Sequence, residues 1–503
     1  MDILAMMANG FGEILTWQSL LSIIVGSALG ICIGGLPGLN ASMGIALLLP
    51  LTYSLTALPA IAMLLAIYCG AIYGGSITAI LLSTPGTTAA ACTVFDGNAL
   101  AKKGEPGKAL SMAATASFVG GIFSVIVLIF LSPPLANVAL MFSPADYFAL
   151  IFFGLSIVSS LSEGQMVKGL ISAVLGLLIS TVGIDIISGT DRFTFGIPEL
   201  LNGVSFIPAL IGLFAVSQLF ITVEKKVLEG GEAAKYVSTA IINFKELMGV
   251  KWTLARSSVL GTLVGILPGA GATMAAFISY NEGKRWSKHP EEFGKGSLEG
   301  IAAPESANNA ATGGAMVPLL TLGIPGSETT AVLVGAFMIQ GIRPGPLLFR
   351  DNPDLVYGLF AALILANIAF YVMGMFGARL FAQVSKIPEK VLIPLILSLA
   401  TIGSYAEHNS LVDVAFMFGF ATLGYFMRKF KFPVAPMVLA LVLGPMAESN
   451  LGRAMVISGG DWSVFYTRPI SLTFMILGLL SLFWPMIRGF RGARAQKSCA
   501  PDI

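Results

Sequence analysis

Apolar stretches without charge, each long enough to cross a bilayer, recur along the whole 503-residue chain. One helix needs about 20 mainly apolar residues to span the hydrocarbon core. Hydrophobic residues make up 55% of the chain and charged residues only 11%, whereas soluble domains carry about 25% charged residues. The sequence therefore predicts an all-α polytopic membrane protein in contact with membrane lipid.

The composition also excludes several classes of function. A net charge of +2 supplies no basic surface, so we expect no nucleic-acid partner. The chain has only two histidines, and no HExxH, GxSxG or P-loop motif occurs, so we expect neither an enzyme nor a bound cofactor. Its four cysteines form no CxxC pair. They therefore indicate neither a disulfide framework nor a zinc site.

Two segment pairs reveal an internal repeat. Gly34 to Met43 reads GGLPGLNASM and Gly265 to Met274 reads GILPGAGATM, at an offset of 231 residues. Similarly, GGSITAILLSTPGTT from Gly74 matches GAMVPLLTLGIPGSE from Gly314, at an offset of 240. We expect two transmembrane repeats, because the order of the motifs is kept.

The predicted domains follow from these repeats and from the charges between them. They are a periplasmic amino-terminal segment (1–17), a first repeat (18–224), a cytoplasmic linker (225–252), a second repeat (253–448), and a final part (449–503) with a periplasmic loop, a last transmembrane helix and a basic cytoplasmic tail.

Corresponding loops of the two repeats carry opposite charge. The loop 281–300 holds four basic residues, but its counterpart 52–58 holds none. Lys and Arg in short loops mark the cytoplasmic side, so the two repeats are predicted to be inverted, as in many secondary transporters. The interpretation gives about 11 crossings plus two re-entrant hairpins, with the amino terminus periplasmic and the carboxyl terminus cytoplasmic.

Four Pro-Gly pairs lie inside apolar runs and should each break a helix. They are Pro37-Gly38, Pro85-Gly86, Pro268-Gly269 and Pro325-Gly326. Polar residues follow the breaks, and we expect these to bind substrate: Asn40, Ser42, Thr87, Thr88, Thr273, Ser327, Thr329 and Thr330. A helix that restarts after a break presents backbone N–H groups and a positive dipole end, which suits a carboxylate. The alternative is that these pairs are kinks that serve packing.

One predicted crossing is unusually polar. Ala303 to Gly314 reads APESANNAATGG, which places Glu305, Asn308 and Asn309 on one helical face. Oxygen ligands suit hard cations, so we expect these residues, together with Glu328, to bind a coupling ion: sodium, or a proton on Glu305. The alternatives are packing through amide hydrogen bonds and a position in the headgroup region. The group Glu407-His408-Asn409 is interpreted as a solvated loop.

These motifs closely resemble the large membrane subunit of the tripartite tricarboxylate transporters. The likeness rests on LPGLNASM, LPGAGATM, STPGTTAA, GIPGSETTA, APESANNAATGG and FDG, and extends from about Gln18 to about Met446. It implies a secondary transporter of the bacterial inner membrane that works with a small integral-membrane subunit and a periplasmic solute-binding protein. It also implies citrate-like substrates and a sodium or proton gradient as the driving force, with the broken helices and Glu305, Asn308 and Asn309 as functional residues.

The predicted function is therefore cation-coupled uptake of a di- or tricarboxylate. A trivalent anion that enters against an inside-negative potential costs about 2.3 kcal/mol per charge per 100 mV, so about three cations must accompany it. The alternative is a passive anion channel or a membrane scaffold subunit. Internal repeats within one chain favour alternating access over a channel.

Overall fold

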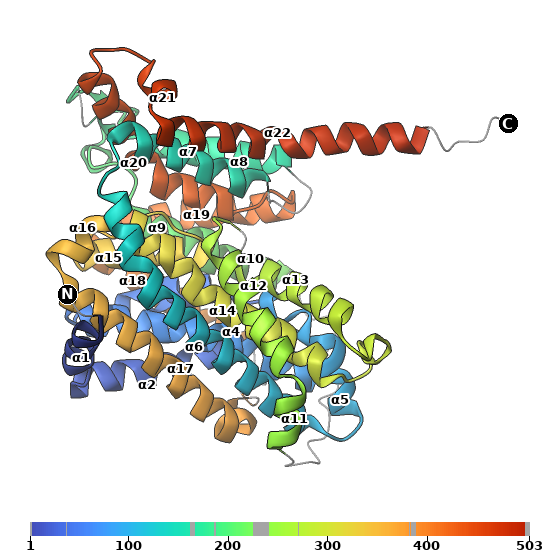
Figure 1. Ribbon diagram of the computed structural model, residues 1–503. Coiled ribbons are helices and arrows are strands. Elements are labelled where there is room, and N and C mark those ends of the chain that lie inside the picture. Colours follow the sequence, from blue (N-terminus) through green and yellow to red (C-terminus); the bar gives the residue numbers. More distant parts are fainter. Residues whose placement is uncertain are drawn as a thin grey trace. The chain divides into compact units, whose positions relative to one another are not determined.

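The computed structural model describes residues 3–36, 38–160, 166–185, 188–224, 241–269, 271–381, 383 and 389–497. Helices account for nearly all regular structure within these ranges (Figure 1). The β structure that they contain is one antiparallel pair, β1 (Gly183–Ile184) and β2 (Asp191–Arg192). The all-α prediction is confirmed, and seven helices are long and apolar enough to cross a membrane.

The elements of the first half are α1 (Ile3–Ile14), α2 (Trp17–Gly34), α3 (Ala41–Leu48), η1 (Leu49–Thr52), α4 (Ala57–Leu82), η2 (Thr88–Ala90), η3 (Val94–Asn98), α5 (Ala99–Lys102), α6 (Pro106–Ala139), α7 (Pro144–Ser160), α8 (Met166–Ser180), η4 (Pro198–Leu200), α9 (Phe206–Leu210), η5 (Ile211–Val216) and α10 (Ser217–Glu224).

The elements of the second half are α11 (Phe244–Gly249), α12 (Lys251–Ile266), α13 (Gly271–Trp286), η6 (Pro290–Glu292), α14 (Leu298–Leu322), α15 (Glu328–Ile339), α16 (Pro346–Asp351), α17 (Pro353–Phe381), α18 (Glu389–His408), α19 (Leu411–Lys429), α20 (Ala435–Ile457), α21 (Val464–Thr467) and α22 (Pro469–Lys497).

The same succession of helices occurs twice. The series α2, α3, α4, α6, α7, α8 and α9 to α10 is matched in order by α12, α13, α14, α17, α18, α19 and α20. The last transmembrane helix that the sequence predicts corresponds to α22, which follows the second series and has no counterpart in the first. Of the predicted linker, residues 225–240 lie outside the described part of the chain, and residues 498–503 of the predicted tail do as well.

The chain divides into two compact units that do not coincide with the repeats. One contains Met1–Ala139 and Ile207–Tyr425, and the other contains Leu140–Phe206 and Phe426–Ile503. Each unit therefore includes helices of both repeats. The breaks and the polar face of α14 all belong to the first unit.

Corresponding helices in the first unit run in opposite directions. The ring of Phe118 on α6 stacks on Tyr371 of α17 at 4.7 Å, and Gly121, one turn later on α6, faces Asn367, one turn earlier on α17. The helices α6 and α17 occupy the same place in the two repeats, so one repeat is inverted with respect to the other.

A second pair of counterparts, α4 and α14, agrees with this inversion. The helix α4 runs parallel to α17, because Leu58 lies against Gly358 and Tyr73 against Gly374. The helix α6 runs parallel to α14, with Ser117 bonded to Glu305 and Ser124 against Gly313. Since α6 and α17 are antiparallel, α4 and α14 are antiparallel too.

Each repeat opens with a hairpin that packs along its next long helix. A side chain at Gly30 or Gly34 of α2 would meet the carbonyl of Ile67 or Ala71 of α4 at 2.5 or 2.1 Å. The backbones therefore touch, and α2 runs parallel to α4. The helix α3 consequently returns the chain toward the side from which α2 starts. Gly261 and Gly265 place α12 against α14 in the same way.

The second unit is built from helices α7, α8, α20 and α22, which lie side by side in Figure 1. Within it, the fully buried carboxylate of Asp146 accepts hydrogen bonds from Ser143, Ser471 and Arg468. The backbones of α8 and α20 approach each other closely, because Gly176 lies against the Met437 carbonyl.

Candidate functional site

The helices end where the Pro-Gly pairs predict. The helix α4 ends at Leu82, and Ser83 follows in the left-handed conformation (φ 58°); α14 ends at Leu322, and Gly323 follows with φ 73°. The helices α2 and α12 end at Gly34 and Ile266. Pro37 lies outside the described residues, whereas Gly38 and Gly269 of the same two breaks have φ 88° and 82°.

Within each repeat the two breaks meet backbone to backbone. A side chain at Gly86 would lie 1.9 Å from the carbonyl oxygen of Gly34, so only glycine permits this approach. In the second repeat, the Gly269 N–H donates to the Gly326 carbonyl at 2.9 Å. The first and second breaks of a repeat thus form one junction.

Side chains then join the breaks of one repeat to those of the other. The Asn40 amide donates to the Glu328 carboxylate at 3.1 Å, and the hydroxyls of Thr88 and Thr273 hydrogen-bond at 2.8 Å. In both pairs, a residue after the first break of one repeat meets a residue after the second break of the other. The two contacts are counterparts under the inversion.

Several of the side chains that were predicted to bind substrate serve as helix caps. Asn40 accepts from the Met43 N–H at the start of α3, and Ser42 donates to the Asn40 side chain. Ser327 and Thr330 form a capping box at the start of α15. These side chains therefore occupy one N–H group of each helix start and fix the direction in which the helix restarts.

The expectation that a helix restarts after every break is wrong for Pro85-Gly86. The chain continues there through the short 3-10 helix η2 and the π-helix η3. The corresponding break at Pro325-Gly326 leads directly into α15, a regular α-helix. The difference gives the segment 87–98 of the first repeat an irregular backbone that the sequence does not predict.

The two cross-repeat pairs differ in exposure. Thr88 is exposed and Thr273 is half-buried, whereas Asn40 and Glu328 are both half-buried and their neighbours Ser42, Ser327, Thr329 and Thr330 are buried. The junction around Thr88 and Thr273 is therefore the more exposed of the two.

The polar face of α14 lies deep in the first unit. Glu305, Asn308 and Asn309 have no exposed surface, so this face is enclosed by protein. Thr93 and Ser117 donate to the two carboxylate oxygens of Glu305, the latter at 3.0 Å. Within the described residues, no Lys, Arg or His forms a salt bridge with Glu305.

Buried oxygen atoms without a hydrogen-bond donor accompany this face. Among the described residues, they include the side-chain amide oxygens of Asn308, Asn309 and Asn367 and the hydroxyl of Thr87. The amide groups of Asn309 and Asn367 both approach Cys69, at 3.5 Å from its carbonyl and 4.0 Å from its sulfur. Buried polar atoms are normally satisfied, and oxygen ligands fit a hard cation such as sodium.

Asn367 is a polar residue that the sequence analysis missed. It interrupts the apolar run of α17 and has no exposed surface. The sequence contains a feature that could have identified it, because an amide inside a membrane-spanning segment is costly and indicates a function or a specific contact.

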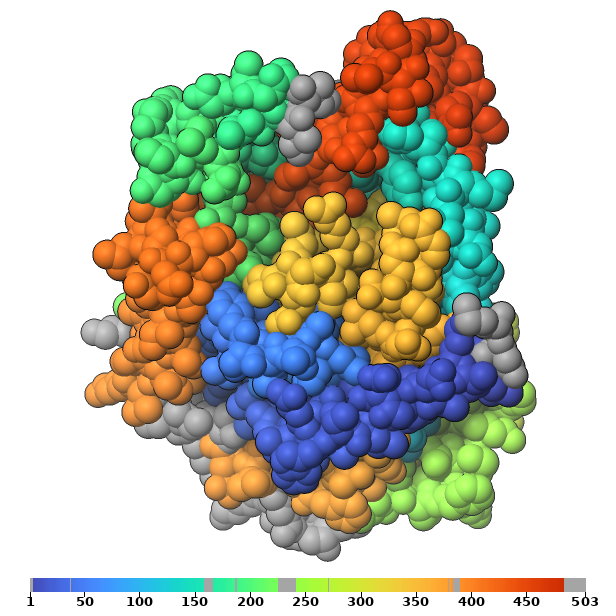
Figure 2. Space-filling model, turned by 90° about the vertical axis from the view of Figure 1, so that its left-hand side faces the viewer, coloured from blue at the N-terminus to red at the C-terminus, as the bar shows by residue number. Residues whose placement is uncertain are grey.

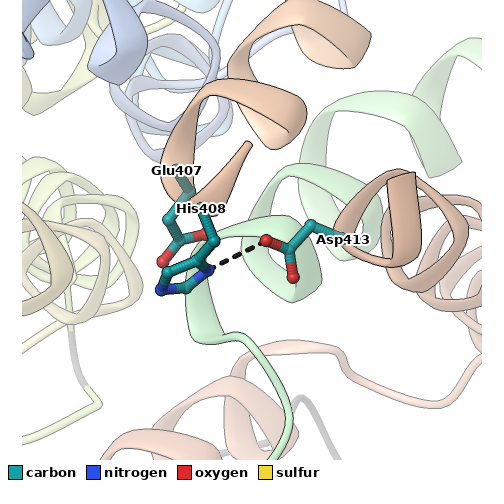
Figure 3. Close-up of side chains that lie close together, drawn as sticks. All are labelled: Glu407, His408 and Asp413. Atoms are coloured by element: carbon teal, nitrogen blue, oxygen red, sulfur yellow. Dashed lines mark hydrogen bonds and ion pairs between the residues drawn. The ribbon is translucent and has the colours of Figure 1, made fainter. Parts of the chain in front are cut away.

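A second group of possible ligands lies at the α18–α19 turn. Glu407, His408 and Asp413 each offer one ligand atom, and these atoms lie within 4.8 Å of one another (Figure 3). The His408 ring hydrogen-bonds to Asp413 at 2.9 Å, and Asp413 is 3% exposed. Of the predicted group, His408 and Asn409 are exposed and Glu407 is half-buried, whereas the sequence analysis did not name the buried Asp413.

The first unit also has a surface pocket of about 710 Å³. It lies where the amino-terminal segments, dark blue in Figure 2, adjoin the gold segment that includes α16. Leu58, Gln340 and Arg343 are among its lining residues. None of the predicted substrate or ion residues lines it.

The fold and this site define a polytopic, all-helical membrane protein with inverted repeats and paired helix breaks. Residues 20–439 match the family model described as "Tripartite tricarboxylate transporter TctA family". The chain belongs to this family, and it is therefore of the class of tripartite tricarboxylate transporter membrane subunits.

Two relatives from Agrobacterium vitis are similar to the chain. One, described as an uncharacterized 52.8 kDa protein in the TAR-I ttuC' 3'region, is 39% identical over 98% of both chains. The other, described as an uncharacterized protein in the TAR-II ttuC' 3'region, is 41% identical over 47% of this chain and 98% of its own length. No solved structure matches.

Proposed function

We propose that the chain takes up a di- or tricarboxylate across the bacterial inner membrane by cation-coupled alternating access. The observation that carries this proposal is the reciprocal pairing of the breaks, Asn40 with Glu328 and Thr88 with Thr273. Broken helices that meet between inverted repeats are where secondary transporters bind substrate and ions.

The substrate would bind between the two cross-repeat junctions. Thr87, Thr88 and Thr273 offer hydroxyl donors to its carboxylates, and the capped starts of α3 and α15 contribute positive dipole ends. Glu328 lies in the same region, so its negative charge must be neutralised when the substrate binds. A proton or a bound cation does this and links the substrate to the coupling ion.

The coupling ion would bind on the polar face of α14. Glu305, Asn308 and Asn309 are buried, and the two amides retain oxygens that accept no hydrogen bond among the described residues. A cation at this depth offsets the cost of bringing an anion into the membrane, about 2.3 kcal/mol per charge per 100 mV. Asn367 extends the same set of oxygens.

Membership of this family adds two partners to the proposal. A periplasmic solute-binding protein would deliver the carboxylate to the outer face, and a small integral-membrane subunit would complete the complex. The exposed Thr88–Thr273 junction would then face the cytoplasm, since the loop that follows α13 is rich in basic residues. The less exposed Asn40–Glu328 junction would face the periplasm.

An uptake assay tests this function. Membrane vesicles that hold the chain and both partners should accumulate radiolabelled citrate, or another carboxylate that stabilises the binding protein in a thermal-shift screen. Accumulation should require a sodium or a proton gradient. Uptake that continues undiminished after both gradients are collapsed would contradict coupling and favour the passive anion channel.

A further inference from the structure

The segment 87–98, which follows the second break of the first repeat, bonds to α13 through Thr88 and to α14 or its preceding loop at three further points. Near its start, the Asn308 amide donates to the Ala89 carbonyl at 3.3 Å. In its middle, the Thr93 hydroxyl donates to Glu305. Near its end, Asp96 binds the loop that precedes α14. All three contacts are to α14 or to its preceding loop.

Asp96 anchors the end of the segment firmly. Its Oδ1 atom accepts backbone N–H groups of Gly294, Gly296 and Ser297 at 2.8 to 2.9 Å, and its Oδ2 atom accepts the Tyr280 hydroxyl at 2.9 Å. The Asp96 side chain has no exposed surface. Four donors therefore satisfy this carboxylate, and the end of the segment is fixed.

Glu305 holds the middle of the segment through a group that can change charge. Its carboxylate accepts from Thr93 of the segment and from Ser117 of α6. An ionised carboxylate only accepts hydrogen bonds, but a protonated one also donates. A proton or a cation on Glu305 takes over an acceptor site, so it competes with the Thr93 hydroxyl.

Other titratable groups near Glu305 are the thiol of Cys92, which belongs to the segment itself, and the Tyr73 hydroxyl of α4. Both are neutral in their ordinary state near pH 7. Ser76 and Asn308 also lie beside the carboxylate and are not titratable in this range. Among these groups, Glu305 is therefore the one whose change of charge can alter the hydrogen bond to the segment.

At the positions that correspond to Glu305, Thr93 and Asp96, the other repeat carries apolar residues. At an offset of 240 residues, the position that corresponds to Glu305 is Leu65. The positions that correspond to Thr93 and Asp96 are Leu333 and Ala336. All three are buried. Apolar side chains are accommodated at these three corresponding positions, so packing alone does not require the carboxylate of Glu305 and the hydroxyl of Thr93.

We propose that Thr93 is a positioning residue that links the charge of Glu305 to the conformation of segment 87–98. When a coupling cation or proton occupies Glu305, Thr93 is released and the segment moves Thr87 and Thr88 relative to the substrate. The inference rests on the proposed function. It assigns coupling to one irregular segment, and the Glu305–Thr93 pair has no polar counterpart in the opposite repeat.

The test measures the reactivity of a cysteine at the exposed position 88 of the full-length chain in detergent. Thr88→Cys is labelled with a maleimide in choline chloride at pH 8, in sodium chloride at pH 8 and in choline chloride at pH 6, and the labelling of the parent chain is subtracted. Saturating cation should change the labelling rate about fivefold or more, the usual lower range of coupling between two sites.

Thr93→Val in this background should abolish the response, whereas Thr93→Ser should keep it. Thr321→Val is the matched control, because Thr321 is equally buried but donates to the Val317 carbonyl of its own helix; it should keep the response. Ser117→Ala should keep the response too, because this substitution removes the other donor to Glu305 and leaves the Thr93 hydrogen bond in place. If Thr93→Val is not recovered folded, Thr93→Ala carries the same expectation.

Two results would overturn the inference, and they distinguish failure of the proposed function from failure of the inference alone. A Thr88→Cys chain that responds to neither sodium nor pH contradicts coupling itself, and the proposed function fails with the inference. A Thr88→Cys chain that responds, together with an equal response in Thr93→Val, contradicts the inference alone.

Discussion

A disulfide between positions 88 and 273 should stop transport completely, and reduction should restore it. The two threonine hydroxyls are 2.8 Å apart, so cysteines at these positions are close enough to bond after a small adjustment. Alternating access requires the more exposed junction to close and reopen, and a covalent link between the repeats prevents that movement.

The measurement is uptake by vesicles that contain the Thr88→Cys/Thr273→Cys chain, before and after oxidation and then after reduction. Each single cysteine variant is treated in the same way and should keep its own activity after oxidation. Full activity in a quantitatively cross-linked double variant would contradict the assignment of this pair to a moving junction.

Asn309→Ala should weaken the coupling cation about tenfold to 100-fold. The residue is completely buried, and its side-chain oxygen accepts no hydrogen bond from the described residues. Loss of one interaction with a charged group costs about 1.5 to 3 kcal/mol, which corresponds to this range. The apparent affinity is measured as the sodium or proton concentration that gives half-maximal uptake.

Asn450→Ala is the control for this substitution. Asn450 donates its amide to the Met446 carbonyl of its own helix and lies in the other compact unit. Its replacement should leave the cation dependence unchanged. Equal cation dependence in Asn309→Ala, Asn308→Ala and the parent would remove the polar face of α14 from the ion site.

The sequence predicts the places where helices end, because Pro-Gly acts locally through the missing N–H and the permissive glycine. It also predicts the inversion, because loop charge records the side of the membrane. The structure confirms these predictions through the ends of α4, α12 and α14 and through the opposite directions of α6 and α17.

The pairing of the breaks could not be predicted from one sequence. Asn40 and Glu328 are 288 residues apart, and their contact depends on how two repeats pack. The irregular course of segment 87–98 was also missed. The residues after Pro85-Gly86 permit a helix locally, but Ala89, Thr93 and Asp96 bond instead to α14 and its preceding loop.

The account depends most on two corresponding loops that face opposite sides of the membrane. Single cysteines at Ser54, after η1, and at Lys288, after α13, test this directly, since both positions are exposed. With a membrane-impermeant maleimide, Ser54→Cys should be labelled only in intact spheroplasts and Lys288→Cys only in inverted vesicles. Labelling of both from the same side would contradict inverted repeats and the substrate site built on them.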